Sequence, residues 1–405
     1  MTVHVVGGVY SEICVHPRWN DVYGSGGRAA FALASMGSEV VLHSYMDDRT
    51  LGVCRDRAVY YDSLRIDHVS TQGCVCFKYL HDMAVPEIFG VPATRYDPLI
   101  IEAEKVVRFG MLEGDAIVRG KWAVYDPQNK RQGQPFAGNG SSATHLALIM
   151  NSQEAACMVG IPDAPPETTA RVLARQQDAE VVIIKMGPQG ALVWSDSKLD
   201  RVPAYRTSRV WKIGSGDCFV AHFAGAWMQD GRSPCEAAEI ASRATAYYSE
   251  TQGLPTKANL ASQPHQAVQL SSAYLRDTSR QVYLAGPFFD LMQISLLEQA
   301  RVNLTDVGLR VFSPYHDIGL GSADDVVSKD LAAIEESDVV FAILDGLDPG
   351  TVFETGYARA IGKPVIVYSE RNPGESLKMM EGSGCILCAD YTTAIYSALW
   401  EAARA

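Results

Sequence analysis

The chain has 405 residues, which exceeds one typical domain and suits two or three. Hydrophobic residues make up 47% of it and charged residues 20%, as in ordinary globular proteins, and the net charge of −12 argues against nucleic acid as the main partner. No apolar run approaches the roughly 20 residues that cross a bilayer, and the first residues lack the basic start of a signal peptide. Nine scattered cysteines favour reduced thiols, so we expect a cytoplasmic protein. From the negative charge and the lack of a long apolar run, we expect neither a nucleic-acid nor a membrane partner.

The first 250 residues alternate strand-like apolar runs with helix-like segments. The first run, residues 1–9, ends at Gly7-Gly8, and a glycine-rich stretch then leads into a small-residue helix over residues 28–36. Further strand-like runs cover residues 39–43, 122–125, 143–150 (open to a helical interpretation) and 181–185, and helices are expected at 214–227 and 235–250. This alternation predicts a mostly parallel sheet with helices on both faces. Residues 59–69 and 74–80 predict a smaller β element suited to a lid.

A glycine turn opens the helix that is expected near residue 214. Gly214, Ser215 and Gly216 let successive backbone N–H groups point inward, and the helix that follows adds its positive end. The turn therefore predicts an anion-binding nest. Asp217, at the end of the nest, could take the proton from a hydroxyl group that attacks a phosphate. The alternative is a plain glycine turn in which Asp217 only caps the helix.

Five features, in chain order, resemble the ribokinase-like (pfkB) kinases of sugars and nucleosides over about residues 1–255. They are Gly26-Gly27 before an alanine-rich helix, Asp126-Pro127, the N-x-x-E motif of residues 151–154 with Gly160, residues 185–190, and the nest with Asp217. The resemblance implies a three-layer α/β domain in which Gly26 and Gly27 meet the substrate and Asp217 is the catalytic base. It implies ATP and Mg²⁺ as cofactors, with Glu154 holding Mg²⁺ indirectly. The residues implied on the nucleotide side are Asn151, Glu154, Lys185, Gly187, Gly190, Gly214, Ser215 and Gly216.

Three places depart from that family's pattern. Phe31 stands where the family often has a sugar-binding asparagine, Ser11 and Glu12 stand near the place of a sugar-binding aspartate, and residues 211–213 replace the usual D-T-x before the nest. A site built for hydroxyl groups depends strongly on such partners. Two hypotheses therefore remain: an active ATP-dependent sugar or nucleoside kinase, or a degenerate nucleotide-binding sensor that regulates the rest of the chain.

The second half is organised around residues 345–368, DGLDPGTVFETGYARAIGKPVIVY. A β-prone run ends in two turn signals, a helix is expected from about Thr351 to Gly362, and residues 364–368 predict the next buried strand. Glu354 is thus expected in the first turn of a helix that follows a strand, where open α/β sheets bind ligands. On position alone, the simpler interpretation is that Glu354 complements the helix dipole.

Upstream motifs change that interpretation. Residues 281–289 (QVYLAGPFF), residues 313–316 (SPYH) and Asp330, followed eight residues later by Asp338, resemble the nucleoside 2-deoxyribosyltransferase family in order and spacing. The resemblance covers about residues 280–370 and implies a smaller doubly wound domain. It implies that Glu354 attacks the anomeric carbon of a nucleoside and forms a covalent glycosyl-enzyme. Asp348 would help to protonate the leaving base, and Asp330 and Tyr283 would complete the catalytic group.

The resemblance also assigns the loop after the first strand of this half. Gly286 and Pro287 are expected to shape the part of the loop that meets the sugar or a 5′-phosphate. Phe288 and Phe289 are candidates to flank the base, although neighbours of a core strand more often serve packing. His316 and Asp338 are expected to be structural. Sites of this family are often completed by a neighbouring subunit, so a homo-oligomer is expected, and base exchange and hydrolysis both stay open.

The sequence therefore predicts two doubly wound α/β domains: a kinase-like domain over residues 1–255 and a deoxyribosyltransferase-like domain over residues 280–405. The intervening residues 256–279, with polar residues and little periodicity, are expected to form a linker. The combined hypothesis is a bifunctional enzyme that acts on small nucleosides, nucleotides or sugars, with no cofactor in its second domain.

Overall fold

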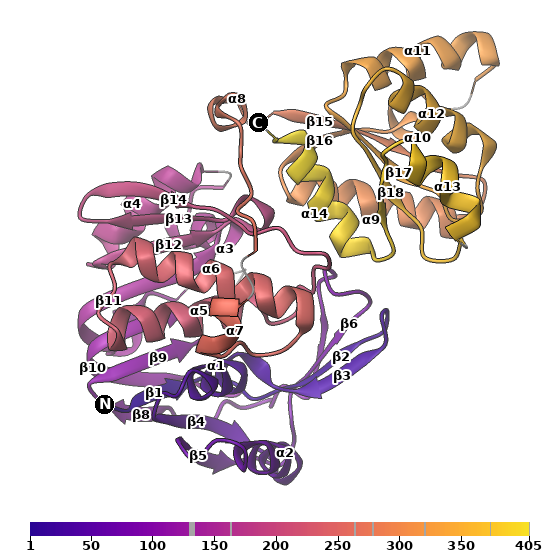
Figure 1. Ribbon diagram of the computed structural model, residues 1–405. Helices are drawn as coiled ribbons and strands as arrows, with labels where there is room; N and C mark the ends of the chain where they lie inside the picture. Colours follow the sequence, from indigo (N-terminus) through magenta and orange to yellow (C-terminus); the bar gives the residue numbers. More distant parts are fainter. Residues whose placement is uncertain are drawn as a thin grey trace. The chain divides into compact units, whose positions relative to one another are not determined.

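The computed structural model describes residues 1–128, 134–162, 164–262, 265–277, 279–319, 321–372 and 374–404. The chain divides into two compact units, the first made of Met1–Thr207 with Trp211–Ala267, and the second of Ser208–Val210 with Val268–Ala405 (Figure 1). Both units are α/β, and each is built on a predominantly parallel sheet, which confirms the predicted fold class. The linker expected at 256–279 holds two short helices, and its positions 263, 264 and 278 lie outside the described residues. The domain boundaries stay a prediction.

The first unit is built on a ten-stranded sheet. Its strand order is β14-β13-β12-β11-β10-β9-β1-β4-β5, with β8 paired to β10, and only β12–β13 and β13–β14 pair antiparallel. The strands are β1 (Val3–Val6), β4 (Val40–Met46), β5 (Leu64–Ser70), β8 (Leu99–Glu102), β9 (Lys105–Phe109), β10 (Ala116–Asp126), β11 (Ser142–Asn151), β12 (Val181–Lys185), β13 (Ala191–Ser195) and β14 (Lys198–Val202). Residues 143–150, which could have formed a helix or a strand, thus belong to a buried strand.

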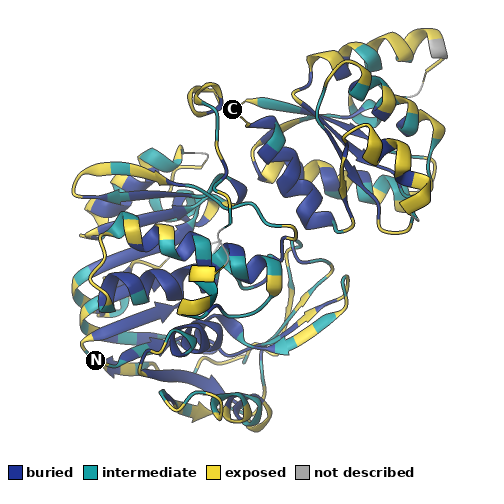
Figure 2. Ribbon diagram, in the orientation of Figure 1, coloured by how far each residue is buried: buried dark blue, intermediate teal, exposed yellow. Residues whose placement is uncertain are grey.

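Helices cover both faces of this sheet, which explains the near-continuous apolar runs of its central strands. One hydrophobic core packs β1, β4 and β12 against α1 and α5, and a second packs β10 and β11 against α3 and α4. The helices are α1 (Gly24–Ser35), α2 (Asp48–Ala58), α3 (Ser152–Val159), α4 (Pro166–Gln176), α5 (Ser215–Ala224), α6 (Pro234–Thr251) and α7 (Lys257–Ser262), with the short helical turns η1 (Phe136–Asn139), η2 (Gly187–Gln189) and η3 (Gly225–Gln229). Buried residues concentrate on the strands and on the inner helix faces (Figure 2).

A separate four-stranded sheet, in the order β3-β2-β6-β7, belongs to the first unit. Its strands are β2 (Ser11–Cys14), β3 (Trp19–Val22), β6 (Cys76–Tyr79) and β7 (Glu87–Phe89). The expected small β element is therefore only partly right. The region 59–69 contributes β5 to the edge of the main sheet, because β5 pairs along its whole length with β4.

The second unit contains a five-stranded parallel sheet in the order β16-β15-β17-β18-β19. Its elements are α8 (Ser272–Arg276), β15 (Arg280–Ala285), α9 (Leu291–Asp306), β16 (Leu309–Phe312), α10 (Pro314–Asp317), α11 (Ala323–Glu336), β17 (Val339–Ile343), α12 (Pro349–Ala360), β18 (Val365–Tyr368), α13 (Gly374–Gly382), β19 (Ile386–Cys388) and α14 (Tyr391–Ala402). Helices α11, α12 and α13 pack on one hydrophobic core of the sheet, and α9 and α14 contact each other and the sheet strands.

The strand order of the second unit reverses direction between β15 and β17. In open α/β sheets such a reversal leaves a crevice at the carboxyl ends of the two strands, and ligands bind there. The segments that leave β15 and β17 carry Gly286 and Glu354, respectively. Among the helices that the structure describes, none is long and apolar enough to span a bilayer.

Candidate active sites

The first unit contains a cavity of about 630 Å³. Its wall combines carboxylates, cations and glycines from the main-sheet loops with aromatic and aliphatic side chains from the small sheet and the loop that follows it. Its lining includes Glu12, Ser25, Asp126, Gln128, Asn151, Glu154, Lys185, Gly214, Gly216 and Asp217. The predicted nest and its acid therefore open into a space large enough for small ligands.

The predicted nest lies at the start of α5. Gly214 caps α5 with a φ of 78°, and a Cβ at this position would lie 2.1 Å from Nε of Arg28. A Cβ on Gly216 would lie 3.3 Å from Nζ of Lys185, so this ammonium group lies directly beside the nest. Asp217 lies in the first turn of α5. A helix N-terminus with an adjacent lysine is suited to bind phosphate.

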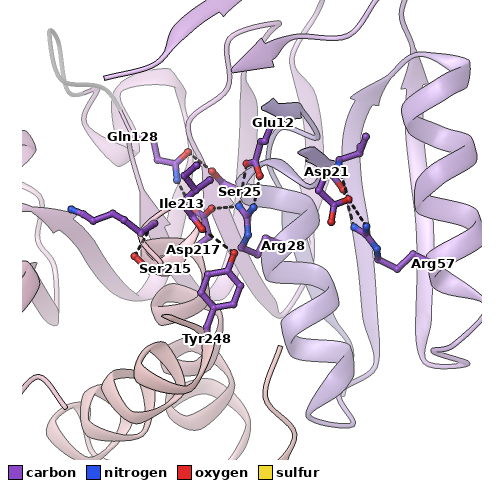
Figure 3. Close-up of polar contacts among 12 residues, drawn as sticks. Glu12, Asp21, Ser25, Arg28, Arg57, Gln128, Ile213, Ser215, Asp217 and Tyr248 are labelled. Carbon is purple, nitrogen blue, oxygen red and sulfur yellow. Dashed lines mark hydrogen bonds and ion pairs between the residues drawn. The ribbon is translucent and has the colours of Figure 1, made fainter. Parts of the chain in front are cut away.

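Both oxygens of the Asp217 carboxylate accept hydrogen bonds from the protein (Figure 3). Arg28 Nη1 donates to Oδ2 at 2.9 Å, and Gln128 Nε2 donates to Oδ1 at 2.9 Å. The amide oxygen of Gln128 in turn accepts a hydrogen bond from the Ser25 hydroxyl at 2.6 Å. The carboxylate is therefore more than a helix cap, because it joins α1, the loop after β10 and α5.

Arg28 lies between two carboxylates and is fully buried. It forms an ion pair with Glu12 through both amino groups, besides its bond to Asp217. Burial raises the pKa of Glu12, and the charge of Arg28 lowers it again in part. A buried cation that lost either partner would leave an uncompensated charge, so this group of three side chains is expected to be rigid.

A second ion pair lies at the nucleotide side of the cavity. Lys185 Nζ donates to Asp126 Oδ2 at 2.8 Å, and burial raises the pKa of Asp126 even beside this lysine. Asn151 and Glu154 form the capping box of α3, in which Glu154 N donates to the Asn151 side chain and Glu154 Oε2 accepts from Asn151 N. The cap uses only Oε2 of Glu154. Its other oxygen can serve a hydrated cation.

Several predicted residues of the first unit lie elsewhere. Gly26 and Gly27 lie inside the first turn of α1, where a Cβ on Gly26 would approach the backbone of Gly7 to 2.6 Å, so Gly26 permits close helix–strand packing. Their neighbours Gly24 and Ser25 line the cavity instead. Phe31 is a core residue of α1.

The remaining predicted positions shape turns. Gly187 and Gly190 bound the turn η2 with φ values of 56° and 88°. The hydroxyl of Ser215 donates to the backbone oxygen of Lys212 at 2.9 Å. The sequence pattern did not lead us to Arg28, Gln128 or Ser25. Only Arg28 offered a signal, because a charged residue directly after Gly26-Gly27 is unusual in a helix made of small residues.

In the second unit, the hydroxyl of Tyr283 on β15 donates to Glu354 Oε1 at 2.7 Å. Burial, followed by the charges of Asp330 and Asp348, raises the pKa of Glu354 to about 7, although the bond from Tyr283 lowers it. The helix begins at Pro349, two residues before the expected start, so Glu354 lies in its second turn and not in the first. Because dipole effects fade beyond the first turn, the helix-dipole interpretation loses its main support.

Two further acids flank Glu354. Burial raises the pKa of Asp330 on α11, and the nearby Tyr283 hydroxyl lowers it again in part. Its Oδ1 is buried, and no hydrogen bond of good geometry reaches it from the described residues. A buried acceptor of this kind is costly unless a ligand hydroxyl group satisfies it. Asp348 caps α12 by accepting bonds from Thr351 N and Oγ1 at 2.8 and 2.9 Å. The cap uses only Oδ2, so Asp348 can hold the helix and still present its other oxygen.

The loop after β15 is shaped by close packing. A Cβ on Gly286 would lie 3.1 Å from the Leu297 side chain and 3.2 Å from that of Ile343, and Pro287 is buried. Phe288 contacts the rings of Phe289 and Tyr315, with centroids 5.7 and 5.5 Å apart. Phe289 is 75% exposed, so the expectation that it serves core packing is wrong.

Two other residues have structural contacts. Asp338 Oδ2 accepts a bond from Gln281 N at 2.8 Å and thereby ties the start of β15 to the segment before β17. His316 Nε2 lies 3.0 Å from Glu298 Oε1.

Two family models match the chain. The model of the pfkB family carbohydrate kinases matches residues 143–257, and that of the nucleoside 2-deoxyribosyltransferases matches residues 282–382. The first match includes the capping box, Lys185 and the nest, whereas Gly26-Gly27 and Asp126 lie before it. No relative among curated proteins matches the sequence.

Solved structures of the ribokinase family resemble part of the chain. Ribokinase from Arabidopsis thaliana, complexed with ribose and ATP, is 17% identical, with 64% of this chain and 97% of that chain covered and a TM-score of 0.48. Ribokinase from Thermotoga maritima is 16% identical, with 64% and 98% covered and a TM-score of 0.45. A nucleoside kinase from Methanocaldococcus jannaschii is 13% identical, with 64% and 96% covered and a TM-score of 0.46. The chain thus joins a segment that matches the pfkB carbohydrate kinases to a segment that matches the nucleoside 2-deoxyribosyltransferases.

Proposed function

We propose that the second unit cleaves or transfers the N-glycosidic bond of a nucleoside or its 5′-monophosphate, with Glu354 as the nucleophile. The observation that carries this proposal is the Glu354 carboxyl group, which is desolvated, bonded to Tyr283 at 2.7 Å and flanked by Asp330 and Asp348. Desolvation strengthens a carboxylate as a nucleophile, and a pKa near 7 keeps a large fraction ionised at neutral pH.

We assign a separate task to each of the four side chains. Tyr283 fixes Oε1 of Glu354, which leaves Oε2 to attack the anomeric carbon as the bond to the base breaks. Asp348 passes a proton from solvent to the departing base, and Oδ1 of Asp330 accepts a bond from a sugar hydroxyl group. Water or a second base then attacks the same carbon and expels the Glu354 carboxylate. Water gives hydrolysis and a base gives exchange.

We further propose that the first unit transfers phosphate from ATP to a sugar or nucleoside. The cavity fits the nucleotide because the nest and Lys185 offer N–H donors and a positive charge for phosphate oxygens. Glu154 would hold the hydration shell of Mg²⁺ through the oxygen that its capping box leaves open. Bound Mg²⁺ would neutralise part of the phosphate charge. Asp217 takes the proton of the acceptor hydroxyl group.

A second candidate function for the first unit is a nucleotide-binding sensor that regulates the glycosyl site. The observation that favours it is that both oxygens of Asp217 are already bonded, to Arg28 and to Gln128. ATP consumption that depends on an added acceptor and is lost in Asp217→Asn would exclude the sensor. Glycosyl activity that changes when ATP is added without being consumed would support it.

We also propose that the protein is a cytoplasmic homo-oligomer. Exposed Phe289, Leu291 and Met292, in and after the loop that follows β15, support a subunit contact near the glycosyl site. The decisive experiment for the second unit incubates the protein with a panel of nucleosides and 5′-monophosphates and measures released base by chromatography. Folded protein that releases base from none of them would remove the proposal.

A further inference from the structure

The Gln128 side chain occupies one of the hydrogen-bonding positions on Asp217 that an acceptor hydroxyl group could use. Its amide, the Asp217 carboxylate and the Ser25 hydroxyl all line the same cavity, and the amide connects the other two (Figure 3). An acceptor must donate a hydrogen bond to Asp217 before it can attack a phosphate. On Oδ1, that bond is already made by Gln128 Nε2 at 2.9 Å.

Of the two side chains that bind Asp217, only Gln128 can leave. Arg28 is fully buried and also bonded to Glu12, so its departure would strand two buried carboxylates. Gln128 is only partly buried and is neutral. Its backbone has a φ of 50°, a left-handed conformation that L side chains rarely adopt and that surrounding contacts must hold in place.

The chemistry of the amide indicates what would replace it. One end accepts a hydrogen bond from Ser25 and the other donates one to Asp217. Two neighbouring hydroxyl groups reproduce this pattern, because one can accept while the other donates. A lone hydroxyl group would satisfy Asp217 and leave Ser25, which is almost fully buried, without its partner.

We propose that Gln128 is an internal occupant of the acceptor site, displaced by a substrate that carries two neighbouring hydroxyl groups. This inference rests on the proposed kinase function of the first unit. Gln128 then determines specificity, because protein molecules in which the amide occupies the site cannot bind the acceptor. The measured affinity of the acceptor is lowered accordingly. Removing the amide should tighten the binding of vicinal diols about tenfold, the size expected for freeing two hydrogen bonds that water only partly replaces.

The test compares two glycine variants of the full-length chain. Gln128→Gly removes the amide, and Gln252→Gly is the matched control, because Gln252 also has a left-handed backbone (φ of 60°), does not line the cavity, and caps α6. Gln128→Asn is a second probe variant, since asparagine tolerates this conformation but its amide is too short to connect both partners. Calorimetric titrations use D-ribose, adenosine and 2′-deoxyadenosine, each with a non-hydrolysable ATP analogue present.

We expect D-ribose or adenosine to bind Gln128→Gly and Gln128→Asn about tenfold more tightly than the wild type. Gln252→Gly should bind them as the wild type does. The gain should be smaller for 2′-deoxyadenosine, which lacks two neighbouring hydroxyl groups. The inference is overturned when neither diol binds Gln128→Gly more tightly than it binds Gln252→Gly. ATP consumption is measured on the same preparations. Its absence in every variant would refute the kinase proposal, while the titrations still decide whether Gln128 occupies the site.

Discussion

Replacing Glu354 with glutamine separates a catalytic role from a structural one. The substitution keeps the shape and an oxygen that can accept the bond from Tyr283, but it removes the charge that meets the anomeric carbon. Loss of a covalent nucleophile is expected to lower base release by about 10³-fold or more. A variant that keeps more than about a tenth of the wild-type rate, a barrier change of about 1.4 kcal/mol, would refute the assignment.

The same substitution has a calculable effect on stability. The pKa of Glu354 rises from 4.5 in the unfolded chain to about 7 in the folded one, so ionisation of this carboxyl group opposes folding. The loss of stability begins near pH 4.5 and grows as the pH rises towards about 7. Each pKa unit corresponds to about 1.4 kcal/mol. Because Glu354 is partly open to solvent and coupled to two acids, we expect Glu354→Gln to stabilise the second unit by about 1–2 kcal/mol at pH 8.

Calorimetric melting at pH 8 and pH 4.5 measures this difference. The gain should appear at pH 8 and vanish at pH 4.5, where the wild-type carboxyl group is protonated in the folded state. Glu381→Gln, an exposed position on α13, removes the same charge and serves as the control. A stability loss at pH 8 with turnover nearly intact would support a purely structural role instead.

Three further predictions follow from single contacts. Tyr283→Phe removes a hydrogen bond that lowers the pKa of Glu354. The acidic limb of the pH–rate profile for base release should therefore move above pH 7, and the rate at pH 7 should fall about 10- to 100-fold. An acidic limb that stays at the wild-type pH would contradict this prediction. Asp217→Asn should abolish acceptor-dependent ATP consumption and leave base release unchanged, as measured by coupled ADP detection and chromatography. Gly26→Ala should destabilise the first unit by about 2 kcal/mol or more, because its Cβ would lie 2.6 Å from the backbone of Gly7; an unchanged melting temperature would refute the packing argument.

The glycosyl site could be predicted because its residues follow local signals. Tyr283 lies in the second half of strand β15, Glu354 lies on the helix after another strand, and parallel strands bring such positions towards one edge. The start of α12 was misplaced although a signal existed: Asp348-Pro349 is an N-cap followed by proline at the first helical position. Reading that pair would have placed Glu354 in the second turn.

The network around Asp217 could not be predicted because its contacts are distant in sequence. Arg28 and Asp217 are 189 residues apart, and Gln128 and Asp217 are 89 residues apart. Phe31 stands where the family pattern has a sugar contact, yet in the fold Phe31 packs in the core and Arg28 pairs with Asp217. The close packing of Gly26 on Gly7 holds α1 near the end of β1, and no local pattern reveals this contact.

The central claim is that Glu354 forms a covalent bond to the sugar during turnover. The most direct measurement is intact-protein mass spectrometry after acid quenching of the full-length chain with a nucleoside that releases base, followed by peptide mapping. The account predicts a mass increase equal to one sugar residue, located on the peptide that contains Glu354 and absent in Glu354→Gln. Continued base release by Glu354→Gln, or an adduct located on a different side chain, would contradict it.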